Sequence, residues 1–143
     1  MIVIKEEKDI QISIHSDKKS VLEFLETLHK ILSDKSFDID NNLILIKKDK
    51  IAEKKLFSTP YTIEKLEYDH LDIVERLKEL TINEYSETKF DVDDDRPPLL
   101  FVFGKNIKGR LVYIKLKIKG KDNKKVLCLS FHFAEKEMRF PYA

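Results

Sequence analysis

Apolar and polar residues alternate along the last third of the chain, as in strands that bury one side. Residues 99–103 form a continuous apolar run that suits a central strand. Residues 111–118 and 126–134 alternate with a period of two. The short connections at 104–109 and 120–125 predict an antiparallel meander. Its expected core face carries Val112, Ile114, Leu116, Ile118, Leu127, Leu129, Phe131 and Phe133.

Earlier in the chain the pattern predicts helices and two short strands. Apolar runs at 10–14 and 43–46 indicate strands, and residues 2–4 suggest another. Helical spacing predicts amphipathic helices over 17–33 and about 69–80, followed by a helical turn at Thr81. The expected apolar stripes are Val21, Leu22, Leu25, Leu28 and Leu32 in the first, and Leu71, Val74, Leu77 and Leu80 in the second.

Polar stretches predict the connections between these elements. Residues 34–41 and 47–55 are expected to be turns or loops, and Thr59-Pro60 to interrupt any helix, because proline disfavours helical geometry in the preceding residue. The acidic segment 91–98 resembles a calcium loop only superficially, since Arg96 stands where such a loop needs glycine. The whole pattern predicts one α+β domain, residues 1–143, with a twisted antiparallel sheet and helices on one face.

Charge is distributed unevenly along this nearly neutral chain. The net charge is +1, but residues 99–143 hold eleven Lys and Arg against three Asp and Glu, giving +8 there and −7 in the rest. The meander could therefore present a basic face to nucleic acid, or the two parts could neutralise each other.

The chain shows no long apolar run, no signal-peptide pattern and one cysteine, so we expect no membrane contact and a cytoplasmic location.

The face of the meander opposite the expected core collects residues able to act on RNA. Strand period places Tyr113, Lys115, Lys117, Ser130 and His132 there, with Arg110 entering from the edge and Tyr142 folding back nearby. Cleavage of RNA through its 2′-hydroxyl needs a base, an acid and positive charge near the phosphate. His132 suits proton transfer, and its lysine neighbours would lower its pKa.

Other interpretations of these residues stay open. A one-sided sheet ordinarily has a polar solvated face, and the same face could bind RNA or a protein without chemistry. Cys128 is expected on the face of His132, which would allow a Cys–His pair. His15, His29 and His70 show no metal-ligand spacing, so we expect no metal and no cofactor.

Three short motifs resemble a known family. Phe103-Gly-Lys, Val112-Tyr-Ile-Lys-Leu-Lys-Ile and Leu127-Cys-Leu-Ser-Phe-His are similar to segments of the MqsR family of type II toxins, within the RelE-like group of messenger-RNA interferases. The likeness covers residues 60–133 in order. The helix at 17–33 fits it too, whereas residues 35–55 look like an insertion.

This resemblance implies a RelE-like fold and a metal-independent endoribonuclease toxin that cleaves mRNA and is held inactive by an antitoxin protein. Tyr113 and Lys115 match the family's Tyr-x-Lys motif, and His132 stands where the family has a lysine. A further family lysine aligns near Ser86 or Lys89. Taking the resemblance together with the basic face of the meander, we expect the catalytic residues to be Tyr113, Lys115, His132 and Arg110. On the same grounds, the expected RNA-binding residues are Lys105, Lys117, Ser130, Lys89 and Tyr142. The alternative is a non-catalytic RNA- or protein-binding module that uses the same basic face.

Overall fold

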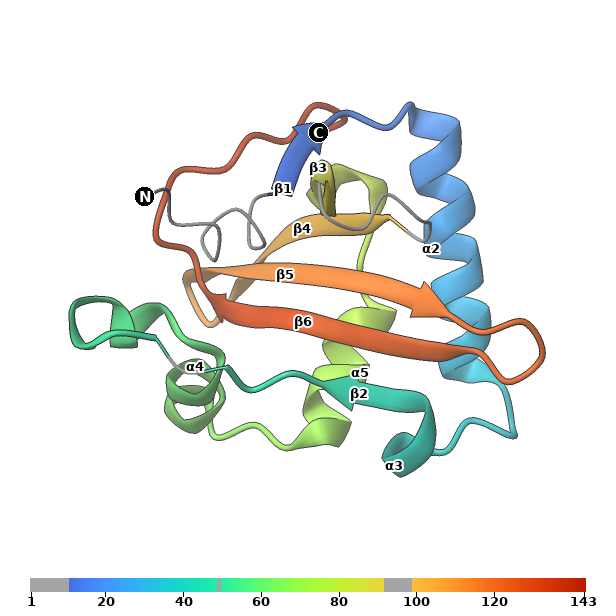
Figure 1. Cartoon of the computed structure of the whole chain (residues 1–143), viewed down its shortest axis with the longest axis horizontal. Coiled ribbons are helices and arrows are strands. Elements are labelled where there is room, and N and C mark those ends of the chain that lie inside the picture. The colour runs from blue at the N-terminus through green and yellow to red at the C-terminus, as the bar shows by residue number, and fades with distance from the viewer. Residues whose placement is uncertain (1–10, 49, 92–98) are drawn as a thin grey trace, which may run out of the picture.

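The computed structural model describes residues 11–48, 50–91 and 99–143. Six strands in these residues form one sheet, in the order β1-β3-β4-β5-β6-β2 (Figure 1). All neighbours are antiparallel except β2, which runs parallel to β6. The strands are β1 (Gln11–Ile14), β2 (Leu43–Leu45), β3 (Tyr85–Asp91), β4 (Leu100–Ile107), β5 (Arg110–Lys119) and β6 (Lys125–Phe133).

The predicted α+β class is therefore confirmed, but the prediction of a wholly antiparallel sheet was wrong. The strand β2 reaches the edge of β6 from far away in the sequence, so no tight hairpin forces the two to run in opposite directions.

The helices of the described residues are α2 (Lys18–Ser33), α3 (Ile39–Asn42), α4 (Thr59–Leu66) and α5 (His70–Lys78), with short 3₁₀ turns η1 (Ala52–Phe57) and η2 (Ile82–Glu84). None of them is long and apolar enough to cross a membrane.

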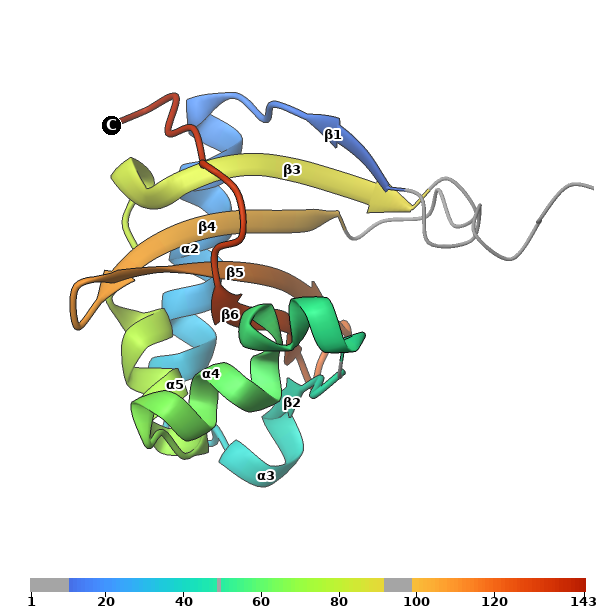
Figure 2. The same ribbon diagram turned by 90° about the vertical axis from the view of Figure 1, so that its left-hand side faces the viewer.

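The helices α2 and α5 bury their apolar stripes against one face of the sheet (Figure 2). The side chain of Asp17 caps α2 and that of Asp69 caps α5. Two predicted core residues are nevertheless exposed, Leu22 by 46% and Leu71 by 61%. Leu22 follows Val21 of the buried stripe, and Leu71 lies two residues before Ile73, the first buried residue of α5. The helix turns by about 100° per residue, so both side chains point away from the core.

The edge of β6 beyond β2 is covered by α4. The hydroxyl oxygens of Thr59 and Thr62 accept hydrogen bonds from the backbone N–H groups of Phe131 and Phe133, at 3.1 and 2.9 Å. This protects an otherwise unpaired strand edge. The prediction that Thr59-Pro60 breaks the helix was wrong, because Pro60 lies in the first turn, where its missing N–H costs nothing.

The boundaries of the middle strands also differ from the prediction. The strand β3 was not predicted at all, although it pairs with both β1 and β4. The expected turn at 104–109 is much shorter, because β4 continues to Ile107 and only Lys108 and Gly109 take positive φ values, 51° and 84°. Residues 34–41 include the start of α3, and the end of the expected loop at 47–55 lies in η1. The expected strand at 2–4 and loop at 92–98 lie outside the described residues.

A β-bulge in β6 changes which side chains face the core. Lys115 pairs with Ser130 but the next residue, Leu116, pairs with Cys128, so Leu129 is the extra residue. The expected placement of Leu127 and Leu129 in the core was therefore wrong. Val126 and Cys128 are fully buried there instead, together with Phe131 beyond the bulge.

The C-terminal segment, residues 134–143, returns across the sheet face that the helices leave open (Figure 2). Gly104 allows the approach, since an added Cβ would lie only 2.8 Å from Cζ of Phe140 and 2.9 Å from Sδ of Met138. Tyr142 stacks on Tyr85 and donates a hydrogen bond to the carbonyl oxygen of Ser16 at 2.6 Å. The segment thus forms a wall above the sheet.

Candidate active site

The strands β5 and β6 bring four of the sequence-predicted residues together. Tyr113 is directly opposite His132, and Lys115 is directly opposite Ser130. All four side chains line one cavity of about 610 Å³ on the sheet face that the C-terminal segment crosses. The expected juxtaposition of these residues is therefore present, on the face opposite the buried Leu116 and Phe131.

Walls from distant parts of the chain complete this cavity. Its floor is extended by β3, one side is formed by β1 and the residue that follows it, and another by the C-terminal segment. The lining residues besides the four above are Ser13, His15, Lys50, Ser86, Glu87, Lys89, Glu135, Lys136, Glu137, Met138 and Arg139.

The rings of Tyr113 and His132 are stacked, with centroids 5.0 Å apart and planes inclined by 11°. Nδ1 of His132 lies 2.9 Å from the carbonyl oxygen of Phe133. A carbonyl only accepts, so Nδ1 carries the proton of the neutral ring. The lone pair is then on Nε2, the nitrogen that a general base would use.

Burial controls the protonation of the three titratable groups on this floor. It lowers the pKa of His132 below its ordinary value, and the charges of Lys50 and Lys115 lower it further, against the hydrogen bond to Phe133. Burial, with the charges of Lys89 and Lys50, lowers the pKa of Lys115 to about 8. Burial, helped by the charge of Glu87, raises the pKa of Tyr113 to about 12.

At neutral pH the floor therefore presents a neutral imidazole, a protonated amine close to its pKa and a phenol. The imidazole can take a proton, and the amine can give one or stabilise negative charge. The phenol can donate a hydrogen bond. These are the functions that acid–base cleavage of a phosphodiester requires.

Cations outnumber anions around the cavity, with five Lys and Arg against three Glu among its lining residues. Two of the glutamates already have partners within the protein. Glu87 accepts a hydrogen bond from Ser13 and lies 4.0 Å from Lys89, and Glu135 is ion-paired with Lys54. The cavity thus suits an anionic ligand.

The remaining predicted residues divide into two groups. Lys89 lines the cavity, and Lys117 lies on the same face of β5 but outside the lining. Tyr142 folds back over the sheet, as expected, but its ring stacks on Tyr85 away from the cavity.

The cavity residues that the sequence did not identify are chiefly Lys50, His15, Lys136 and Arg139, which come from segments without strand periodicity.

Two predicted cations belong to the opposite, helix-covered side. The guanidinium of Arg110 lies 3.5 Å from the centroid of the Phe133 ring, so the expectation that it joins the cluster was wrong. Lys105 is only 13% exposed and pairs with Glu84 at 3.2 Å and Glu79 at 3.5 Å. Lys105 lies in β4 and Arg110 in β5, and each is directly opposite a core residue of the neighbouring strand. Both side chains therefore point to the core side of the sheet, away from the cavity.

The possible Cys–His pair does not exist. Cys128 is fully buried on the core side of the bulge, where burial raises the pKa of its thiol to about 12. A thiol in that state is a poor nucleophile. Among the described residues, no three His, Cys, Asp or Glu side chains gather in a group that could hold a metal ion.

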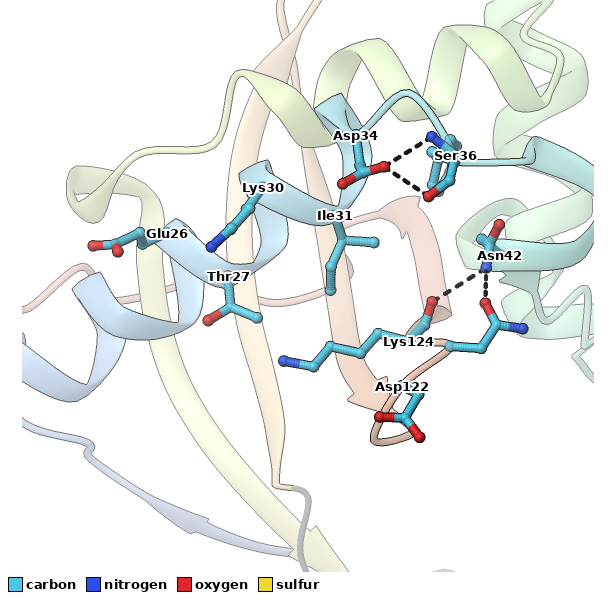
Figure 3. A pocket seen from close by; sticks show the side chains of 11 residues that line it. Glu26, Thr27, Lys30, Ile31, Asp34, Ser36, Asn42, Asp122 and Lys124 are labelled. Atoms are coloured by element: carbon cyan, nitrogen blue, oxygen red, sulfur yellow. Dashed lines mark hydrogen bonds between the residues drawn. The ribbon is translucent and has the colours of Figure 1, made fainter.

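A separate cavity of about 330 Å³ lies between the end of α2 and the β5–β6 turn (Figure 3). Several of its polar groups bond to one another: Asp34 accepts from the N–H and hydroxyl of Ser36, and Nδ2 of Asn42 donates to Asn123 and to the carbonyl of Lys124. These bonds anchor the turn to the helices, so we place the site on the opposite face.

Comparisons of the chain with protein-family models, with curated proteins and with solved structures gave no match.

Proposed function

We propose that this protein is a metal-independent endoribonuclease that cleaves mRNA in the cavity over β5 and β6. The observation that carries the proposal is the cross-strand pairing of Tyr113 with His132 next to Lys115, which puts a base, an acid and a hydrogen-bond donor in one cationic cavity. The short motifs similar to MqsR-family toxins agree with this activity and with a RelE-like arrangement of the central strands.

The reaction balances with these residues alone. Nε2 of His132 accepts the proton of the 2′-hydroxyl, and the 2′-oxygen forms a bond to the adjacent phosphorus. The bond from phosphorus to the 5′-oxygen breaks, and the ammonium of Lys115 gives that oxygen a proton. The products are a 2′,3′-cyclic phosphate and a 5′-hydroxyl end, and solvent returns the two catalytic groups to their starting states.

Charge around the cavity would stabilise the phosphorane. Lys115 stands on the floor, while Lys89 and Lys50 approach from opposite sides. Fixed cations of this kind act most strongly where water is partly excluded. The hydroxyl of Tyr113 would donate a hydrogen bond to a non-bridging phosphate oxygen, since its pKa of about 12 keeps it protonated.

The test is incubation of the purified protein with single-stranded RNA in the presence of EDTA. We expect fragments that end in a 2′,3′-cyclic phosphate and begin with a 5′-hydroxyl, and their loss in His132→Ala. Absence of cleavage by the wild-type protein in EDTA would contradict the proposal, whether or not added metal restores cleavage.

Binding measurements separate cleavage from the alternative of a non-catalytic module. RNA that binds with a steep salt dependence but stays intact would favour that module. Replacement of Lys115 and Lys117 together should then weaken binding and reduce the salt slope. The toxin role is tested separately: expression should arrest growth, and co-expression of a cognate antitoxin protein should restore it.

A further inference from the structure

A second cavity, of about 370 Å³, adjoins the one just described. Lys50, Lys115, Ser130 and His132 line both, so the proposed catalytic groups stand at the boundary between them. The residues that line only the smaller cavity are Ile46, Lys48, Thr59 and Leu129. No acidic residue is among the described residues that line it.

The apolar wall of the smaller cavity is held by the backbone. The N–H of Ile46 donates to the carbonyl oxygen of Cys128 at 2.9 Å, which continues the β2–β6 pairing by one residue. Leu129 is the bulge residue of β6, and the bulge turns its side chain out of the core and into the cavity. Two aliphatic side chains therefore face a cavity whose charged lining residues, among those the structure describes, are all lysine or histidine.

We propose that the two cavities hold the two nucleotides joined by the cleaved phosphate, and that the smaller one receives a base against Ile46 and Leu129. This inference rests on the proposed ribonuclease function. Cleavage through a 2′-hydroxyl involves the ribose on one side of the phosphate and the 5′-oxygen on the other. A site for this reaction must therefore seat a nucleotide on each side of the catalytic groups.

The chemistry of the smaller cavity fits this ligand. A base is a flat, mostly apolar ring, and contact with the two aliphatic side chains removes apolar surface from water. Lys48 and Lys50 line the same cavity, so their ammonium groups could bind the phosphates next to such a base. The ligand must be single-stranded, because a base inside a duplex is stacked and cannot enter a pocket.

The experiment measures binding of a fluorescent, single-stranded 2′-O-methyl oligonucleotide, which cannot be cleaved because it has no 2′-hydroxyl. The variants are Ile46→Ala and Leu129→Ala, and the control is Ile44→Ala. Ile44 is exposed to nearly the same degree as Ile46, at 36% against 39%, and does not line the cavity. Ile46 is a surface position, so its variant should fold even where Leu129→Ala does not.

We expect Ile46→Ala and Leu129→Ala to weaken binding about fivefold, the effect of losing about 1 kcal/mol of apolar contact, and Ile44→Ala to leave it unchanged. On cleavable RNA, both cavity variants should alter the base preference on one side of the cut only. Equal binding by all four proteins, or an unaltered preference, would overturn the inference while leaving the ribonuclease proposal intact. Binding that depends on Ile46 but gives no cleavage would overturn the ribonuclease and keep the subsite. A wild-type protein that binds no oligonucleotide at low salt would overturn both.

Discussion

The phenol ring of Tyr113 and the imidazole of His132 lie face to face, 5.0 Å apart, because the antiparallel register of β5 and β6 sets the two residues directly opposite each other. The pairing restrains the imidazole on one side, and the hydrogen bond from Nδ1 to the carbonyl of Phe133 restrains it at its edge. Nε2 is therefore presented to the cavity without a large entropic cost when substrate binds.

The first prediction concerns His132. His132→Ala should reduce RNA cleavage by roughly 10²–10⁴-fold, as expected on loss of a positioned acid or base. His132→Lys should also fail near neutral pH, since an ammonium is a poor base. Gel assays at several pH values measure both, with His70→Ala as the control because His70 does not line the cavity. Rapid cleavage by His132→Lys would leave the position an electrostatic role only.

The pH dependence of cleavage should be bell-shaped. The rate should rise with pH through the pKa of His132, which burial holds below its ordinary value, because only the neutral ring accepts a proton. The rate should fall near pH 8, where Lys115 loses its proton. Lys115→Arg should slow cleavage, because a guanidinium is a poor acid, and should move the alkaline limb of the remaining activity to higher pH, because arginine stays charged. An alkaline limb that does not move would assign the acid to another residue.

Tyr113 offers a matched pair of substitutions. Tyr113→Phe keeps the ring stacked on His132 and removes only the hydroxyl, so it should slow cleavage about tenfold to a hundredfold, the effect of one lost hydrogen bond to a charged group. Tyr113→Ala removes the stack as well and should in addition lower the melting temperature. Single-turnover kinetics and thermal unfolding measure the two effects. Full activity in Tyr113→Phe would exclude the hydroxyl from the reaction.

The buried charge of Lys115 should lower the free energy of unfolding of the wild-type protein at neutral pH. Its pKa is about 8 in the folded protein, against about 10.4 in an unfolded chain, so the unfolded state binds the proton more tightly. At pH 7, Lys115→Met should raise the free energy of unfolding by roughly 1–2 kcal/mol. This is less than the full difference between the two pKa values would give, because the side chain keeps some contact with solvent. The stability of the wild type should rise between pH 8 and 10, and the advantage of the variant should shrink there. Urea titrations at pH 7 and pH 10 provide the comparison, and a loss of stability in Lys115→Met at pH 7 would contradict it.

The C-terminal wall of the cavity depends on Gly104. Gly104→Ala should destabilise the fold by about 1 kcal/mol, the low end for an added methyl group, because the ends of the Phe140 and Met138 side chains must move away from it. In a Phe140→Ala background the same change should cost less, since the nearest atoms are gone. A double-mutant cycle from urea unfolding measures this coupling. Strict additivity would mean that the segment does not pack on Gly104 in solution.

Local pattern determined much of this molecule before any tertiary contact is considered. Period-two alternation in 111–118 was enough to place Tyr113 and Lys115 on one face of a strand, and the helical spacing of apolar residues was enough to locate α2 and α5. These features depend on residues close in sequence, whose spacing and hydrogen bonds are set by the geometry of a single strand or helix.

Tertiary structure alone decided the rest. A bulge depends on how two strands pair, so alternation in the sequence could not show that Leu129 leaves the core and Cys128 enters it. The positions of Lys50, His15 and Arg139 around the cavity depend on how a loop, an edge strand and the C-terminal segment fold over the sheet. None of these contacts is local, and the sequence carries no periodic signal for a side chain whose place is set by packing between distant segments.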